Sequence, residues 1–259
     1  MPGSTRVVDT HERVANPDGD FLLEVTKGLA KGHAVVAFNG HNDTVGTSEE
    51  TLWNEGGLVA FPSAAALLTV SSDSTDDDAG GTGALTVLIS GLDANFVEAA
   101  PEIVTLSGQT AVTMTTSLLR VNTMVNLTAG SGGKNAGHIY VGSGSVTTGK
   151  PATVVDLIDT GNNITDSGFY TVPAAKSAYL VSAVFTGTGN KTAELSVYTR
   201  TDGALFLRIF EADLDNGPVV MNRVPPPRKI PAKTDIELRS LAGTSADVKA
   251  FVTLITVDD

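Results

Sequence analysis

Hydrophobic and polar residues alternate with a period of two along most of this chain, and this pattern predicts β-strands. In the segment ALTVLIS, Leu85, Val87 and Ile89 fall on one face and a mixed set of residues falls on the other. Residues 82–120 read as three or four short strands joined by tight turns, because GLDAN and the Ser-Gly pair at 107–108 favour turn geometry. We expect antiparallel hairpins in this part of the chain.

The second half of the chain continues the same pattern. Its apolar segments are short and are separated by turn residues, without the long helical segments that connect the strands of a parallel sheet. They are FYTV, SAYLVSAVFT, AELSVYTR, ALFLRIFEA, DIELRS and VKAFVTLITV. The sequence therefore predicts an all-β protein of two tandem antiparallel β-sandwich or jelly-roll-like domains, preceded by an extended N-terminal arm.

Domain boundaries follow from changes in this pattern. The polar segment DTGNNITD interrupts it at residues 159–166, so we expect a first β domain over residues 55–160 and a second over 161–259. Two proline turns in the second half, VPAAK and IPAK, each lead into an apolar segment. Aligned on their prolines, Leu180 and Leu238 coincide, which suits two equivalent strand entries in one sandwich.

Residues 1–54 differ from the rest of the chain, and we interpret them as an arm that packs on a neighbouring molecule. The alternative is a pair of strands that completes the first domain. Trp53, the single tryptophan, favours core packing, but it also suits an oligomer contact because aromatic anchors are frequent at interface centres. The predicted partner-contact residues are Phe21, Leu22, Val25, Val35, Val36, Phe38 and Trp53.

Composition narrows the classes of function. The formal net charge is −12, and such a surface repels nucleic-acid phosphate and anionic lipid. The absence of cysteine excludes disulfides, thiolate nucleophiles and cysteine-ligated zinc. With no signal-peptide pattern and no apolar run of membrane-spanning length, we expect a soluble protein that is not secreted.

Candidate chemistry is sparse. The acidic run of Asp73, Asp76, Asp77 and Asp78 suggests a calcium site. Its spacing does not match an EF-hand loop, so a solvated loop is favoured. His33 and His41 lack a third ligand at a suitable spacing for a metal site. The sequence contains neither a nucleophile-elbow motif nor a phosphate-binding loop. We therefore predict no catalytic, cofactor-binding or metal-binding residues, and hence a protein that is not an enzyme.

Several phrases of the sequence, taken together, resemble virion structural proteins of tailed bacteriophages. They are GHAVVAFNGHNDTVGTSEETLWNEGG, TGALTVLISGLDANFVEAAPEIVTLSG, TAGSGGKNAGHIYVG, YTVPAAKSAYL and IPAKTDIEL, which are spread over most of the chain. The resemblance implies a non-enzymatic, oligomeric particle component of the capsid decoration (cement) type, with a homotrimer favoured. Its partners would be the major capsid protein or other virion proteins, and its location the capsid exterior after synthesis in the host cytoplasm.

Two other functions remain as alternatives. One is a tail, baseplate or fibre-adaptor component of the same kind of particle. The other is a carbohydrate-binding or glycan-degrading β-protein, for which exposed aromatic platforms would be expected, whereas aromatic residues make up only 5% of the chain.

Overall fold

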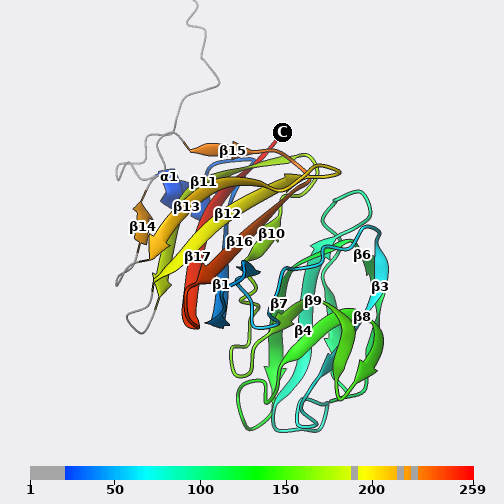
Figure 1. The fold of residues 1–259 in the computed structure, drawn as a ribbon. Coiled ribbons are helices and arrows are strands. Elements are labelled where there is room, and N and C mark those ends of the chain that lie inside the picture. The colour runs from blue at the N-terminus through cyan, green and yellow to red at the C-terminus, as the bar shows by residue number, and fades with distance from the viewer. Residues whose placement is uncertain (1–20, 188–191, 215–218, 223–226) are drawn as a thin grey trace, which may run out of the picture.

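A computed structural model describes residues 21–187, 192–214, 219–222 and 227–259. It shows two antiparallel β-sandwiches side by side, with one short helix (Figure 1). The predicted all-β class and the antiparallel pairing are confirmed. Within the described part of the chain, no helix is long and apolar enough to cross a membrane.

The first sandwich contains seven strands. One sheet has the order β6-β3-β8-β9 and the other the order β5-β4-β7. Val87, Met124 and Ile139 come from both sheets and meet in one buried core. The strands are β3 (Ala66–Ser72), β4 (Ala84–Leu92), β5 (Glu102–Thr105), β6 (Val112–Leu118), β7 (Arg120–Ala129), β8 (Ile139–Thr147) and β9 (Lys150–Ile158).

The second sandwich is built from the C-terminal strands together with two strands from near the N-terminus. One sheet has the order β1-β17-β11-β14 with β15 also paired to β11, and the other has the order β10-β16-β12-β13 with β2 paired to β16. The strands are β1 (His33–Val45), β2 (Glu50–Thr51), β10 (Phe169–Thr171), β11 (Lys176–Gly187), β12 (Ala193–Thr201), β13 (Leu207–Leu214), β14 (Val219–Asn222), β15 (Arg228–Ile230), β16 (Thr234–Ala242) and β17 (Ala246–Asp258).

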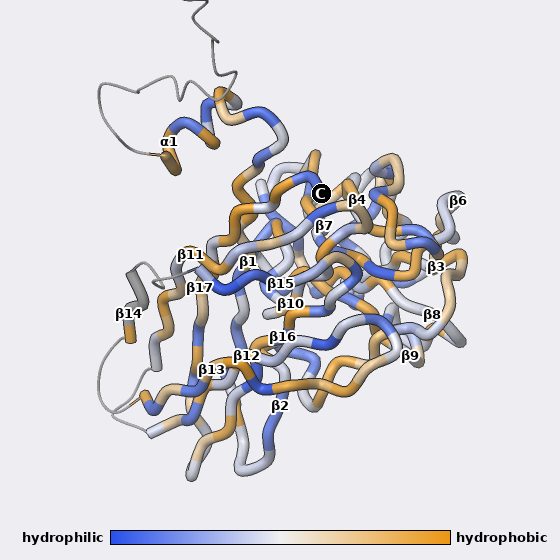
Figure 2. The backbone as a smooth tube through the Cα atoms, turned by 90° about the horizontal axis from the view of Figure 1, so that it is seen from above, coloured by the Kyte–Doolittle hydropathy of each residue, from blue (hydrophilic) through white to orange (hydrophobic). Residues whose placement is uncertain are grey.

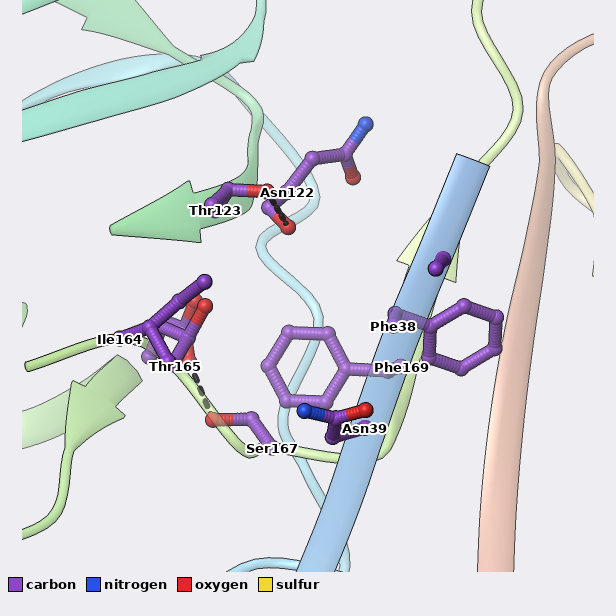
Figure 3. A pocket seen from close by; sticks show the side chains of 10 residues that line it. Phe38, Asn39, Asn122, Thr123, Ile164, Thr165, Ser167 and Phe169 are labelled. Carbon is purple, nitrogen blue, oxygen red and sulfur yellow. Dashed lines mark hydrogen bonds between the residues drawn. The ribbon is translucent and has the colours of Figure 1, made fainter. Parts of the chain in front are cut away.

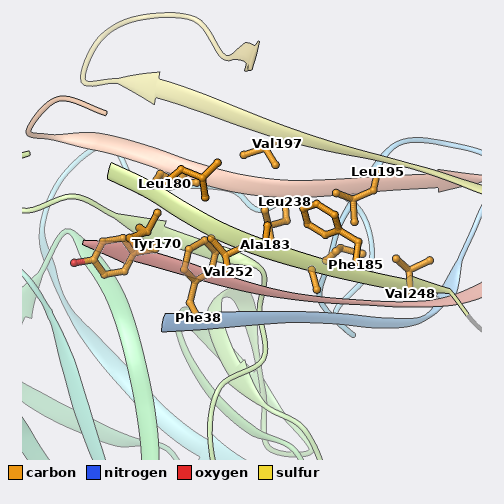
Figure 4. Packing of buried hydrophobic residues seen from close by; sticks show 14 of the residues in the cluster. Phe38, Tyr170, Leu180, Ala183, Phe185, Leu195, Val197, Leu238, Val248 and Val252 are labelled. Carbon is orange, nitrogen blue, oxygen red and sulfur yellow. The ribbon is translucent and has the colours of Figure 1, made fainter. Parts of the chain in front are cut away.

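Alternation along the strands builds the core of this second sandwich. Phe38, Ala183 and Val252 are partners in the register of β1, β11 and β17, so their side chains share the inner face. Leu195 and Leu238 come from the opposite sheet and pack against them (Figure 4).

The predicted arm needs correction where the structure describes it. Residues 33–51 form β1 and β2, and β1 pairs with β17 along almost its whole length. These residues therefore complete the second sandwich, and they form neither an arm nor a part of the first domain. The physical reason is that HAVVAF supplies an edge strand whose inward Phe38 fills the second core. Residues 1–20 of the predicted arm lie outside the described residues.

Helix α1 (Phe21–Thr26) precedes β1 and lies at the edge of the second sandwich, away from the first (Figures 1 and 2). The structure thus places the predicted contact residues 21–25 on a short helix.

The segment between β9 and β10 connects the two sandwiches and touches both. Ile164 bridges to Val125 of β7, and Ser167 bridges to Gly40 of β1. A Cβ atom at Gly40 would lie 2.7 Å from the Cα atom of Gly168, so this crossing requires glycine. The connection is therefore held against a strand of each sandwich.

Candidate functional site

The sandwiches meet at a buried ion-pair network centred on Asp235 of β16. Arg120, the first residue of β7, places its Nε 2.8 Å from Oδ1 and its Nη2 3.1 Å from Oδ2 of this carboxylate. Arg200 of β12 places its Nη2 2.6 Å from Oδ2, and Thr171 Oγ1 donates to Oδ1 at 2.7 Å. One carboxylate of the second sandwich thus binds an arginine of the first.

Strand alternation explains why this carboxylate reaches the junction. Ile236 and Leu238 of β16 point into the second core, so Asp235 and Glu237 point to the opposite face of the sheet. Burial alone would raise the pKa of Asp235, but hydrogen bonds and charge from Arg120, together with Thr171 and Arg200, hold that pKa below its ordinary value. The carboxylate is therefore charged and fully paired.

Aromatic rings enclose Arg120. Its guanidinium lies 5.1 Å from the ring centroid of Phe61 and 5.4 Å from that of Phe96. Its Nη1 also donates to the backbone oxygen of Pro62 at 2.6 Å. The arginine thus joins the sandwiches through charge, hydrogen bonds and ring contacts.

A second ion-pair group continues the network along the same sheet face. Arg239 of β16 donates to Glu237 at 2.7 Å and to Glu49 at 3.1 Å, and Thr51 Oγ1 donates to the other oxygen of Glu237. The guanidinium stacks 4.3 Å from the ring centroid of Tyr198, whose hydroxyl donates to Glu49 at 2.8 Å. Burial raises the pKa of Glu237, and this effect exceeds the opposing one of Arg239.

This network connects the two sandwiches through ion pairs, and we call it the joint. Arg120, Arg200 and Arg239 each pair with at least one carboxylate. A second pair of sandwich-to-sandwich hydrogen bonds lies beside it, because Asn122 of β7 both donates to and accepts from the backbone of Thr171 at 3.0 Å. Such a joint fixes how the two sandwiches are oriented.

Two histidines face carboxylates at another part of the junction. Nε2 of His41 on β1 lies 3.1 Å from Oδ1 of Asp247, and its Nδ1 lies 4.0 Å from Oδ2 of Asp159, which follows β9. His138 lies 3.0 Å from Asp73 and 3.6 Å from Asp159. Asp159 therefore stands between a histidine of each sandwich.

Burial raises the pKa of Asp159, although a 2.6 Å hydrogen bond from Asn54 and the nearby His138 and His41 oppose that rise. The two histidines weighed from sequence as a metal pair are not brought together, because His33 contacts the Lys31 carbonyl and the ring of Phe21 instead. Across the described residues, no cluster of three or more His, Asp or Glu side chains is arranged to hold a metal ion.

The acidic run at Asp73 to Asp78 is organised as a structural turn around Asp77, which is fully buried. The carboxylate of Asp77 accepts hydrogen bonds from the backbone N–H groups of Ala84, Ala136 and Gly137 and from the hydroxyl of Ser72, at 2.7 to 2.9 Å. It thereby ties the loop after β3 to the loop before β8. Both oxygens of Asp77 are therefore already occupied by hydrogen bonds.

A small cavity of about 40 Å³ lies beside the connection between the sandwiches. Figure 3 shows Phe169 and Asn39 on one side of it, and Thr123 and Ile164 on the other. This volume suits a few water molecules and is far below that of sites for small-molecule ligands.

Asp156 of β9 lines this cavity and is almost completely buried. Burial raises the pKa of Asp156 to about 7, although it accepts a 2.5 Å hydrogen bond from Ser167 and one from the backbone N–H of Leu157. The sequence offered no signal for this residue, because β9 reads as an ordinary apolar strand.

The predicted partner-contact residues separate into two groups. Val25, Phe38 and Trp53 are buried within the chain itself. Trp53 packs against Phe169 and donates its Nε1–H to the backbone oxygens of Gly56 and Gly57. These three side chains are therefore corrected to core residues, because their surface is already covered.

The other predicted contact residues retain some exposure. Phe21 is 50% exposed, whereas Leu22, Val35 and Val36 are half-buried. Val36 packs on the second core from the inner face of β1, and Val35 lies on its outer face.

Sequence reasoning did not single out several strongly exposed apolar residues. Leu205 is 83% exposed and Leu207 66% exposed at the turn between β12 and β13. In the first sandwich Ile103 of β5 is 61% exposed. Strand alternation alone could have flagged Ile103, because Val104 takes the inward position beside it.

Comparisons with known proteins add little to this geometry. No protein-family model matches the sequence, and no curated protein matches it. A structure of infectious bursal disease virus Gt strain is similar at 12% identity, over 88% of this chain and 77% of that chain, with a TM-score of 0.20. The VP2 subviral particle of infectious bursal disease virus is similar at 11% identity, over 88% and 76%, also with a TM-score of 0.20. Similarities at this level establish neither a shared fold nor a shared function.

Proposed function

We propose that this protein is a non-enzymatic structural component of a tailed-bacteriophage virion, most specifically a capsid decoration protein that binds the outer surface of the shell. The proposal starts from the resemblance of its strand and turn phrases to such proteins. Its partners are the shell protein and other copies of itself. Its place is the exterior of the head.

One structural observation carries the proposal: the two sandwiches are joined by a saturated ion-pair network around Asp235. A decoration protein acts through binding alone, and it resists outward pressure only if its contact surfaces hold fixed positions relative to each other. The buried Arg120 and the partly buried Arg200, both paired with Asp235, provide that rigidity. Its charges are committed to one another rather than to a substrate.

The N-terminal side supplies the proposed contact with the shell. Phe21 and Leu29 are 50% and 69% exposed near the start of the described chain. Apolar anchors of this kind gain binding energy when a partner removes them from water. Many copies on one shell would make individually weak contacts strong together.

The test is a comparison of particles with and without this protein. Purified particles that lack it are heated, and DNA release is followed by a fluorescent dye; added wild-type protein is expected to raise the release temperature. The Phe21→Asp/Leu29→Asp variant should restore it less, whereas Leu205→Asp, a matched exposed apolar position, should restore it fully.

If the wild-type protein does not bind heads, or does not raise the temperature of DNA release, the decoration role is contradicted. Binding confined to isolated tails would favour the tail or baseplate alternative. Saturable binding to a glycan array would favour the carbohydrate-binding alternative.

A further inference from the structure

The sheet β5-β4-β7 of the first sandwich presents an uncharged apolar row on its outer face. Leu88 of β4 pairs with Ile103 of β5 on one side and with Val125 of β7 on the other, and Ile164 of the connection bridges to Val125. Residues that pair directly in an antiparallel sheet point to the same face. The alternate residue Val87 lies in the core, so this row points outward.

Hydroxyl side chains flank the row on both sides. Thr86 of β4 pairs with Thr105 and Thr128, and the hydroxyls of Thr86 and Thr128 lie 2.6 Å apart. Ser90 pairs with Thr123 at the other side of the row. We call these nine residues the outer face of the first sandwich: Thr86, Leu88, Ser90, Ile103, Thr105, Thr123, Val125, Thr128 and Ile164. Thr123 and Ile164 form its edge next to the second sandwich, where they also line the cavity beside the connection.

The ionisable side chains of the three strands are directed away from this outer face. Strand β4 contains none. Glu102 of β5 accepts hydrogen bonds from the backbone N–H groups of Thr115 and Thr116 in β6, and Arg120 of β7 is buried in the junction. The outer face is thus a neutral surface on a chain whose net charge is −12.

Four of the nine residues of the outer face are exposed, and the other five, with Leu88 and Val125 among them, are half-buried. Ile103 is 61% exposed and Ile164 is 43% exposed, and Leu127 of β7 next to the face is 45% exposed. An apolar row with exposed residues at both ends can serve as a contact surface.

We propose that the outer face of the first sandwich is the contact between two copies of this chain, packed sheet on sheet about a two-fold axis. Net charge favours this contact between copies. Two copies of a strongly acidic protein repel each other over most of their surfaces, whereas two neutral faces can meet without opposing carboxylates. Pleated faces rich in threonine and β-branched residues stack well at about 10 Å.

The size of the face sets the expected strength. Three strands and the connection, spaced by about 4.8 Å, and about six residues of length give roughly 400 Å² per copy. That is small for a protein interface, so we expect a weak dimer. This contact belongs to the isolated chain, so it stands or falls independently of the proposed capsid role.

Sedimentation equilibrium of the full chain from about 1 to 500 µM tests the proposal. The average mass of the wild type should rise from 26.6 kDa toward twice that value. Ile103→Lys should lower the association constant at least tenfold because it places a charge in the contact, whereas Leu205→Lys, exposed on the second sandwich, should leave it unchanged. Circular dichroism and the melting temperature check that each variant is folded.

A second measurement uses the absence of cysteine from the chain. Leu88→Cys and Ile103→Cys place single thiols on the outer face, and Leu205→Cys places one elsewhere. Mild oxidation should give a disulfide-linked dimer with at least one face variant at a yield several times that of the control.

Three results would overturn the proposal. The wild type could remain monomeric over the whole concentration range. It could associate, as a dimer or a trimer, with a strength that Ile103→Lys does not alter. Cross-linking at the face could also be no greater than at position 205.

Discussion

At the scale of single residues, the two most informative carboxylates are Asp235 and Asp156, because their pKa values are shifted in opposite directions. Asp235 is buried with two arginines and a threonine hydroxyl, which hold its pKa down. Asp156 is buried with only a serine hydroxyl and a backbone N–H, and its pKa rises to about 7. Burial has the same sign for both, and the partners decide the outcome.

Breaking the Asp235 group should be costly. Arg120→Met leaves a buried carboxylate without its bidentate partner, so we expect the free energy of unfolding in urea to fall by about 3–5 kcal/mol. Lys150→Met removes an exposed ion pair with Glu55 and serves as the control, with a loss of less than about 1 kcal/mol. Equal losses in the two variants would contradict the assignment of the network as the joint.

The pH dependence of Asp235 follows from its lowered pKa. Its contribution to stability is present above the ordinary aspartate pKa of about 4 and is lost as the pH falls through the lower folded-state value. Asp235→Asn should therefore lose less stability than the wild type between pH 5 and pH 2.5. Parallel curves for the two proteins would refute the pairing.

The expectation for Asp156 has the opposite sign. Its folded-state pKa of about 7 exceeds the unfolded value of about 4, so folding takes up a proton between these pH values and stability falls as the pH rises through them. Between pH 4.5 and pH 7.5 the free energy of unfolding in urea should fall by about 3 kcal/mol less in Asp156→Asn than in the wild type. Asp213→Asn, at an exposed position on β13, is the control and should leave the free energy of unfolding unchanged at both pH values. A change in this control as large as that in Asp156→Asn would contradict the role given to Asp156.

At the scale of elements, the loop after β3 shows how a polar run can serve structure. Asp77 holds three backbone N–H groups and one hydroxyl, and Asp76 beside it is exposed. We expect Asp77→Ala to lower the free energy of unfolding by about 3 kcal/mol or more, because it leaves buried donors unpaired. Asp76→Ala should have almost no effect. A melting temperature that rises with added calcium in the wild type but not in Asp77→Ala would restore the calcium interpretation.

Strand alternation and turn residues are enough to predict the strands. They predict less well which sandwich each strand belongs to. The proline turns VPAAK and IPAK do lead into β11 and β16, with Leu180 and Leu238 both in the core. Each turn also contains a residue with positive φ at the matching place, Ala175 and Lys233. The membership of β1 was missed because its partner β17 lies some 200 residues away, and nothing local encodes such a pairing.

The junction is equally hidden from the sequence. Arg120 and Asp235 are 115 residues apart, and each reads as an ordinary charged residue in a strand. Only the packing of two sandwiches makes them partners. In the same way, the sequence predicts Phe38 and Trp53 as contacts for a neighbour because the core that covers them comes from distant strands.

At the scale of the whole molecule, the joint should make the two sandwiches unfold together. Differential scanning calorimetry of the wild type should give one transition, because the network and the Asn122 to Thr171 hydrogen bonds couple the domains. The Arg120→Met/Asn122→Ala variant should separate it into two transitions or broaden it. Two transitions in the wild type would show that the joint does not couple the sandwiches.

We propose that this chain is a rigid binding module on the outside of a virus head. The most direct measurement is a cryo-electron microscopy map of the intact particle with this chain labelled at an exposed position. We expect density for both sandwiches in regular copies over the shell, with α1 and its exposed Phe21 turned toward the capsid. Density confined to the tail, or a particle without this chain, would contradict it.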